Sequence, residues 1–359
     1  MAPLAVTLAA GVVIGFGVAL ARAGEDRLPH GPRRRRRALG LQRSEAVAAG
    51  LRRMAIEQAE LAIEELSASG DGDARRSVHE ARKAIKRMRT IVRMQERRLG
   101  PGGCALEQQA LRSVAARLAG ARDAEVMLDT LEAVIEREPH KLAGRAGVTS
   151  LRLALAAERD RAAQLVLEPE NLRAACDGLR GFRERAARWE RGEERGLGAT
   201  RHGVRRIYRR GRRRMRRAAA AGDMRTMHQW RKRVKDLRYA AEAIAPVGAE
   251  PLPGTPRKRR RLARAQARRL RLVARRADKL GELLGEDHDL AVLGEWIDAH
   301  GAGAGAGKGT RKRLGKAISR RRRKLRRRAL REGAELYRRS PKRFVECAEK
   351  ACRRSRVLG

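Results

Sequence analysis

The chain of 359 residues carries 86 lysines and arginines against 42 aspartates and glutamates, which gives a formal net charge of +44. Only 3% of its residues are aromatic, and this argues against a β-sandwich or β-barrel, whose strands are enriched in aromatic and β-branched residues. Because a charge of this size strains a compact state by self-repulsion, we expect the partner to be a polyanion.

The first 38 residues differ from the rest of the chain. Residues 2–21 form an uncharged, largely apolar run that is long enough to span a bilayer as a helix, and an Arg-rich linker follows it up to residue 38. No Lys or Arg precedes the run, so the positive-inside rule predicts a cytoplasmic protein whose N-terminal helix anchors it to the inner face of the membrane. A cleaved secretory signal and a helix docked on protein remain alternatives.

Residues 39–355 read as helix after helix, without strand-like alternation of useful length. Turn signals separate the helices at residues 67–73, 100–103, 137–140, 192–198 and 220–223. The Pro-rich segment 246–256 is predicted to be a loop, and the Gly/Ala run 301–309 a flexible linker. The run lacks the first glycine and the Ser or Thr of a phosphate loop. The expected fold class is therefore all-α.

A duplicated motif is the most informative feature of the sequence. The segment VHEARKAIKRMR at residues 78–89 returns as MHQWRKRVKDLR at residues 227–238, and both share the skeleton HxxRKxxKxxR. On a helix this spacing gives a basic stripe opposite an apolar seam, with Ile85 and Met88 in one seam and Trp230 and Val234 in the other. The stripes consist of His79, Arg82, Lys83, Lys86, Arg89 and Arg93, and of His228, Arg231, Lys232, Lys235 and Arg238. The duplication predicts two pseudo-symmetric antiparallel helical bundles, about residues 44–191 and 193–355, each contributing one basic stripe.

The stripes differ from an ordinary solvated helix face. Such faces usually place acids four residues from bases, whereas these stripes place like charges at that separation. Residues 201–217, 257–276 and 320–331 also contain no acid, and we interpret all these arrays as lining an anion-binding groove. Supporting roles are expected for Arg122, Asp123, Arg205, Arg209, Arg212, Tyr239 and Asp289.

Histidine and cysteine spacing gives no metal or cofactor site. Neither repeat offers the second ligand that a metal needs, and Cys104, Cys176, Cys347 and Cys352 are scattered. As phosphate ligands, His79 and His228 would strengthen anion binding as the pH falls from about 8 to about 6. A structural role for both histidines remains an alternative.

The two repeats, the pair Arg238-Tyr239, the segment LLGEDHD that we expect to form a turn around Asp289, and LYRRSPKRF at residues 336–344 together resemble the conserved histidine α-helical domain family, CHAD. The resemblance covers about residues 40–355. It implies two related helical bundles around a basic cavity that binds inorganic polyphosphate through the residues of both stripes.

Polyphosphate suits the composition independently of the resemblance. It is a linear anion without bases, so it requires Arg and Lys along a groove but no aromatic stacking platforms. Nonspecific nucleic-acid binding at low salt is the first alternative, because the charge of +44 attracts any polyanion. A metal-dependent phosphohydrolase built around His288-Asp289 is a second alternative, although no set of further ligands is apparent. We expect a binding protein without catalytic residues or cofactors.

Overall fold

The computed structural model describes residues 39–42, 45–68, 74–190, 197–245 and 257–356, all within one compact unit, Arg37–Gly359. The predicted N-terminal helix of residues 2–21, and the anchor assigned to it, lie outside these ranges. The described residues form helices and no strand, which confirms the all-α class. Within the same ranges, no helix is both long and apolar enough to cross a membrane.

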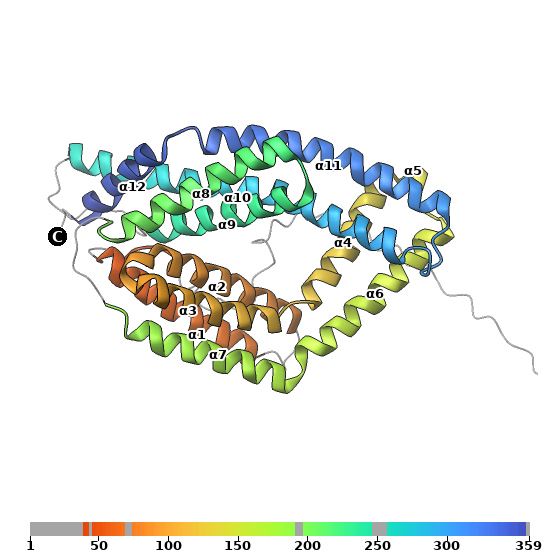
Figure 1. Ribbon diagram of the computed structural model, residues 1–359, viewed down its shortest axis with the longest axis horizontal. Coiled ribbons are helices and arrows are strands. Elements are labelled where there is room, and N and C mark those ends of the chain that lie inside the picture. Colours follow the sequence, from red (N-terminus) through yellow and green to blue (C-terminus); the bar gives the residue numbers. More distant parts are fainter. Residues whose placement is uncertain (1–38, 43–44, 69–73, 191–196, 246–256, 357–359) are drawn as a thin grey trace, which may run out of the picture. The chain divides into compact units, whose positions relative to one another are not determined.

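Twelve helices follow one another along the described part of the chain (Figure 1). In chain order they are α1 Val47–Ser67, α2 Ala74–Met94, α3 Glu96–Arg117, α4 Ala121–Arg137, α5 Pro139–Leu142, α6 Ala146–Leu167, α7 Pro169–Ala187, α8 Thr200–Ala221, α9 Met224–Ile244, α10 Arg257–His300, α11 Lys308–Leu336 and α12 Pro341–Arg356.

The helices of the two halves pack in the same order. In the first half α1 packs on α2 and α7, and α4 packs on α6. In the second half α8 packs on α9 and α12, and α10 packs on α11. The long helix α10 thus takes the place of both α3 and α4. This shared order agrees with an internal duplication, with α2 and α9 in equivalent positions.

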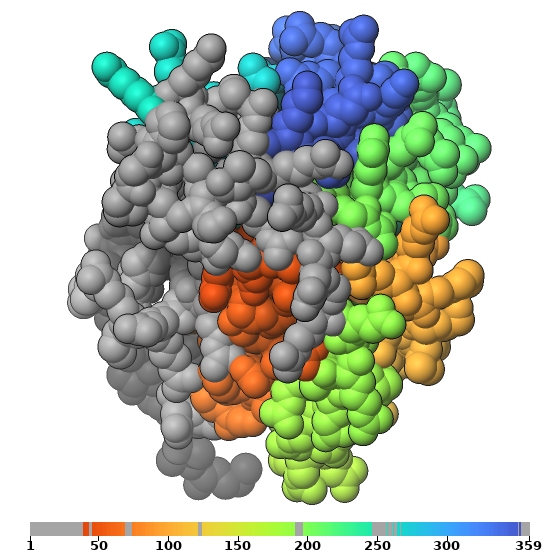
Figure 2. All heavy atoms as spheres, turned by 90° about the vertical axis from the view of Figure 1, so that its left-hand side faces the viewer, coloured from red at the N-terminus to blue at the C-terminus, as the bar shows by residue number. Residues whose placement is uncertain are grey.

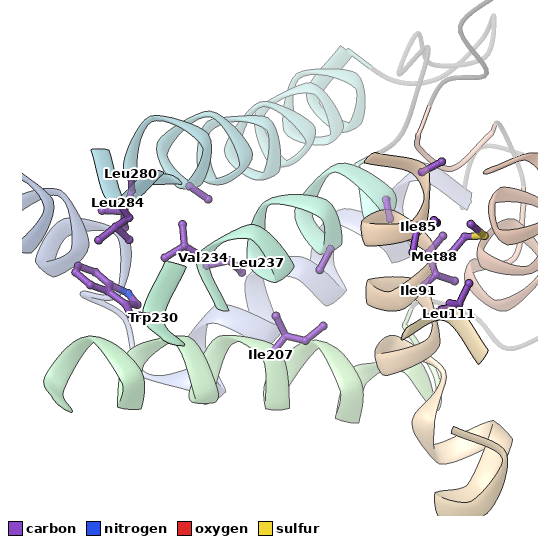
Figure 3. Packing of buried hydrophobic residues seen from close by; sticks show 14 of the residues in the cluster. Ile85, Met88, Ile91, Leu111, Ile207, Trp230, Val234, Leu237, Leu280 and Leu284 are labelled. Carbon is purple, nitrogen blue, oxygen red and sulfur yellow. The ribbon is translucent and has the colours of Figure 1, made fainter. Parts of the chain in front are cut away.

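The apolar seams of the two repeated helices form the core (Figure 3). Ile85 and Met88 of α2 pack in the same buried cluster as Leu111 of α3, and Trp230 of α9 is fully buried in it. Burying such side chains stabilises the fold by roughly 1.5–3 kcal/mol each. The basic stripes are therefore presented from helices whose opposite faces are fixed in the core.

The turn predicted at residues 220–223 and the linker predicted at residues 301–309 have different outcomes. At residues 220–223 the prediction is confirmed, because Gly222 ends α8 with a φ of 61° and the Asp223 side chain accepts a hydrogen bond from the backbone N–H of Thr226, 2.8 Å away. The Gly/Ala run 301–309, predicted to be a flexible linker, forms a turn over residues 301–305, and α11 begins at Lys308. A Cβ on Gly301 would lie 2.4 Å from the carbonyl oxygen of Ile297, and Ala306 is buried. Close backbone approach, rather than flexibility, explains glycine at 301.

Helix α8 lies directly against α2 and α3 (Figure 2). The closest approach is at Gly203, where a Cβ would come within 2.5 Å of the carbonyl oxygen of Met94. Because only glycine fits there, α8 runs close enough to α2 for arginines from both helices to interact.

Candidate functional site: a cationic cluster at the junction of α2, α8 and α9

A buried carboxylate joins the two repeated helices. Asp236 of α9 is 7% exposed, and its Oδ1 accepts hydrogen bonds from Nη1 of Arg93, at 3.2 Å, and from Oγ1 of Thr90, at 3.5 Å, both on α2. Its Oδ2 lies 3.0 Å from Nη1 of Arg233, one turn away on α9. Asp236 therefore holds cations from α2 and α9 at one point.

Cations from three helices gather around this carboxylate and around its partner Arg233, and we call them the cationic cluster. The cluster consists of Arg89 and Arg93 from α2, Arg210 and Arg214 from α8, and Lys232 and Arg233 from α9. Lys232 is exposed and the other five are half-buried. The two stripes thus converge where Arg89 approaches Lys232.

Burial and mutual repulsion both disfavour the charges of the cluster. Burial and the positive charge of Arg93 together lower the pKa of Arg89 to about 10. Burial also lowers the pKa of Lys232, where Arg233 and then Arg89 add to the effect. The cluster therefore holds crowded like charges that an added anion would stabilise.

The same two causes act on the α8 arginines of the cluster. Burial and the charges of Arg206 and Arg233 lower the pKa of Arg210. The pKa of Arg214 is lowered as well, by burial first and then by neighbouring arginines. Helix α8 therefore contributes to the same region of positive charge as the stripes.

The side chain of Arg89 is positioned from α3. The Nε2 of Gln108 donates a hydrogen bond to the carbonyl oxygen of Arg89 at 2.7 Å, and its Oε1 accepts from the Nε of Arg89 at 3.5 Å. Gln108 is buried, so it restrains Arg89 without neutralising it. A neutral amide is well suited to hold a cation in place for an incoming anion.

Several stripe residues are engaged within the fold. Arg82 donates to the carbonyl oxygen of Leu118 at 3.1 Å, and the Nζ of Lys83 lies 3.2 Å from Oε1 of Glu80. Arg238 is buried between Glu242 and Asp278. Burial opposes its charge, but the two carboxylates outweigh that effect and raise the pKa of Arg238. The remaining stripe residues outside the cluster are half-buried, namely His79, Lys86, His228, Arg231 and Lys235.

The predicted supporting residues are dispersed. Arg205 and Arg209 are exposed and Arg212 is half-buried, while Tyr239 is buried with the guanidinium of Arg238 5.6 Å from its ring centroid. The predicted turn around Asp289 is wrong, because α10 continues through it, and Asp289 therefore caps no helix. The side chains of Arg122 and Asp123 lie outside the described part.

The structure pairs His228 with His288 of α10. Their ring centroids are 4.2 Å apart, and Nδ1 of His228 is buried without a hydrogen-bond partner in the described structure. Next to them, Gly285 lies against the guanidinium of Arg231. Burial, His288 and the neighbouring cations lower the pKa of His228 to about 4. His228 therefore stays neutral between pH 8 and 6 and adds nothing to the increase in anion affinity predicted over that range.

The lowered pKa of His228 predicts acid sensitivity of the fold. An unfolded chain takes up a proton at histidine near pH 6.5, but the folded chain does so at His228 only near pH 4. The free energy of unfolding should therefore fall as the pH drops from about 6.5 to about 4. Urea unfolding at pH 7.5 and 5 should show a smaller fall for His228→Gln than for wild type. His140→Gln, which changes an exposed histidine, should behave like wild type; equal falls in all three proteins would contradict the assignment.

The acid-free segment 320–331 proves to be ion-paired through the tertiary structure. Arg321 forms a two-point pair with Glu286 at 2.7 and 2.8 Å, and both Arg322 and Arg326 bind Asp287. The carboxylates come from α10. The interpretation of this segment as part of an anion groove is therefore wrong at these positions, because its acids are distant in sequence.

The repeated skeleton points to neither Arg233 nor Asp236, and Arg210 and Arg214 were predicted only as part of the acid-free array 201–217. Arg233 and Asp236 both occupy variable positions inside the repeated skeleton, each between two of its basic residues. A signal for Arg210 was present on α8, because this residue directly precedes Gly211, one of the glycines that mark close contacts of the helix.

Histidine, cysteine and carboxylate groups do not assemble into a metal site in the described ranges. No group of three or more such side chains there could hold a metal ion.

The fold and site define a class: an internally duplicated all-α protein with a cationic cluster where its two halves meet. The family model of the CHAD domain matches residues 53–298, and the chain belongs to this family. Membership supports a polyphosphate-related role at the level of the family.

Solved structures show the same fold. The CHAD domain from the plant Ricinus communis is 19% identical, with 87% of this chain and 99% of that chain covered and a TM-score of 0.50. PptA from Streptomyces chartreusis is 18% identical, with 80% and 99% covered and a TM-score of 0.54. A search of curated proteins found no match. At these identities the likeness concerns the fold alone.

Proposed function

We propose that the protein binds inorganic polyphosphate without catalysing its breakdown, and that the cationic cluster forms the centre of the binding site. The observation that carries the proposal is the convergence of Arg89, Arg93, Arg210 and Arg233 around one carboxylate, with Lys232 beside Arg233 and Arg89. Burial and crowding lower the pKa values of Arg89, Arg93, Arg210 and Lys232. A linear chain of phosphates can supply several negative charges to such a cluster at once.

The placement of aromatic residues favours polyphosphate over single-stranded nucleic acid. Proteins that bind single strands stack bases on accessible aromatic rings. Here no described aromatic side chain is exposed; Trp189 and Trp296 are half-buried, and six are buried, namely Phe182, Tyr208, Trp230, Tyr239, Tyr337 and Phe344. The described surface therefore offers cations without stacking platforms.

The cellular location forms part of the same proposal. We propose that the protein acts in the cytoplasm and that residues 2–21 hold it at the inner face of the membrane. The basis is the apolar run and the arginines that follow it.

The test is binding of labelled polyphosphate by the whole chain at physiological salt, in competition with duplex DNA. We expect DNA at equal phosphate concentration to displace little polyphosphate. Because the ligand binds the folded state, polyphosphate should also raise the melting temperature by several degrees, and more at low salt. Efficient displacement by DNA, or no change in melting temperature, would contradict the proposal. Orthophosphate release with added magnesium or manganese, abolished by His288→Ala, would instead favour the hydrolase.

A further inference from the structure

A second site lies between α8, α10, α11 and α12. It is a cavity of about 110 Å³ whose inner wall is apolar, formed by Leu270, Val273, Leu336, Phe344 and Ala348. The ring of Tyr208 also lines it and stacks on Phe344, with centroids 4.1 Å apart and an interplanar angle of 10°. The hydroxyl of Tyr208 lies 3.1 Å from the carbonyl oxygen of Arg339 and is thereby satisfied within the fold.

The rim of this cavity is cationic. Arg269, Arg276, Arg338 and Arg339 line it and are all exposed, and the acidic residue among the lining residues is Glu335. None of the six cations of the cationic cluster lines it. The site therefore combines an apolar pocket with a positive rim, which distinguishes it chemically from the cluster.

The size and lining of the cavity limit what can bind. Pockets for drug-sized molecules and cofactors measure about 300–1,000 Å³, and an apolar cavity of about 150 Å³ accepts a benzene molecule. A space of about 110 Å³ matches one aliphatic side chain. Polyphosphate suits the wall poorly, because phosphate oxygens placed against apolar carbon lose hydrogen bonds to water without replacement.

We propose that this cavity docks an acidic peptide segment of a partner protein, with one leucine side chain in the pocket and flanking carboxylates on the arginine rim. The apolar anchor supplies the specificity, and the charges of the rim orient the segment and speed its association. This interaction is independent of polyphosphate binding at the cluster.

The proposal is tested with two labelled peptides, Asp-Glu-Leu-Glu-Asp and Asp-Glu-Ala-Glu-Asp, titrated with the whole chain at physiological salt. Both carry the same charge, so the ratio of their affinities isolates the pocket from general attraction to a basic protein. Burial of the leucine should favour the first peptide by about tenfold. Equal affinities in the wild type would overturn the proposal.

Substitutions in and outside the cavity test whether the leucine preference arises there. Val273→Phe fills the pocket and should reduce the ratio to about one, whereas Leu153→Phe, at an exposed position on α6, should leave it unchanged. Arg276→Gln with Arg338→Gln should weaken both peptides equally and preserve the ratio. If Val273→Phe does not fold, Leu272→Ala removes an exposed side chain from the same wall and should lower the ratio severalfold. A ratio that survives these pocket variants would also overturn the proposal.

Measuring polyphosphate binding by the same proteins tests the docking site and the proposed function separately. Val273→Phe should retain the wild-type rise in melting temperature with polyphosphate. A wild-type chain that binds polyphosphate but shows no leucine preference would refute the docking site alone. A wild-type chain that prefers the leucine peptide but does not bind polyphosphate would refute the proposed function alone.

Discussion

Replacing Arg210 and Arg214 together by glutamine should weaken polyphosphate binding at least about tenfold, since a single hydrogen bond to a charged group contributes roughly 1.5–3 kcal/mol. Both arginines belong to the cationic cluster and lie one turn apart on the same face of α8. The variant should also melt at a higher temperature than wild type in low salt without ligand, because it removes repulsion from Arg233. Fluorescence anisotropy and thermal unfolding measure the two effects.

Helix α8 offers a closely matched control. Arg205→Gln with Arg209→Gln removes the same charge at the same spacing on the same helix, but from exposed positions. We expect a loss of less than about threefold, in line with the small worth of exposed ionic contacts. If both double variants lose affinity equally, total charge rather than the cluster determines binding.

Asp236→Asn should have the largest effect on stability. The substitution preserves the shape of the side chain but removes the buried carboxylate that Arg93 and Arg233 share. Removing one partner of a buried ion pair costs about 3–5 kcal/mol, so the free energy of unfolding in urea should fall by about this amount. Polyphosphate should bind the variant more tightly than wild type and restore much of the lost stability, because Asp236 competes with the ligand for the same cations.

The control for this prediction is Asp177→Asn, which changes a solvent-exposed aspartate paired with Arg180. Its stability should stay within about 0.5 kcal/mol of wild type. Weaker polyphosphate binding by Asp236→Asn would show that Asp236 acts by positioning the arginines instead of by competing for them.

The Arg210/Arg214 double variant and Asp236→Asn together test how the cationic cluster affects both stability and binding. The unliganded protein keeps positive charges close together, and Asp236 offsets their repulsion only partly. Polyphosphate would complete the neutralisation, which links affinity to the same repulsion that limits stability.

Local patterns in the sequence were sufficient for the all-α class, the helical repeat and the apolar seams. Ile85 and Trp230 are buried as predicted, because a helix with one apolar face must cover that face. The duplication could also be predicted from the sequence, since the two repeats share the same spacing of basic residues. Helix formation and the apolar seam of each repeat depend on residues within one or two helical turns of each other.

The tertiary structure decided which cations remain available for an anion. Arg238 and Arg321 look like Arg89 in the sequence, yet Asp278 and Glu286, each 35 or more positions away along the chain, neutralise them. Conversely, Arg210 joins the cluster because Gly203 allows α8 to approach α2. The charge of a side chain follows from its type, but its nearest neighbours follow from how helices distant in the sequence pack together.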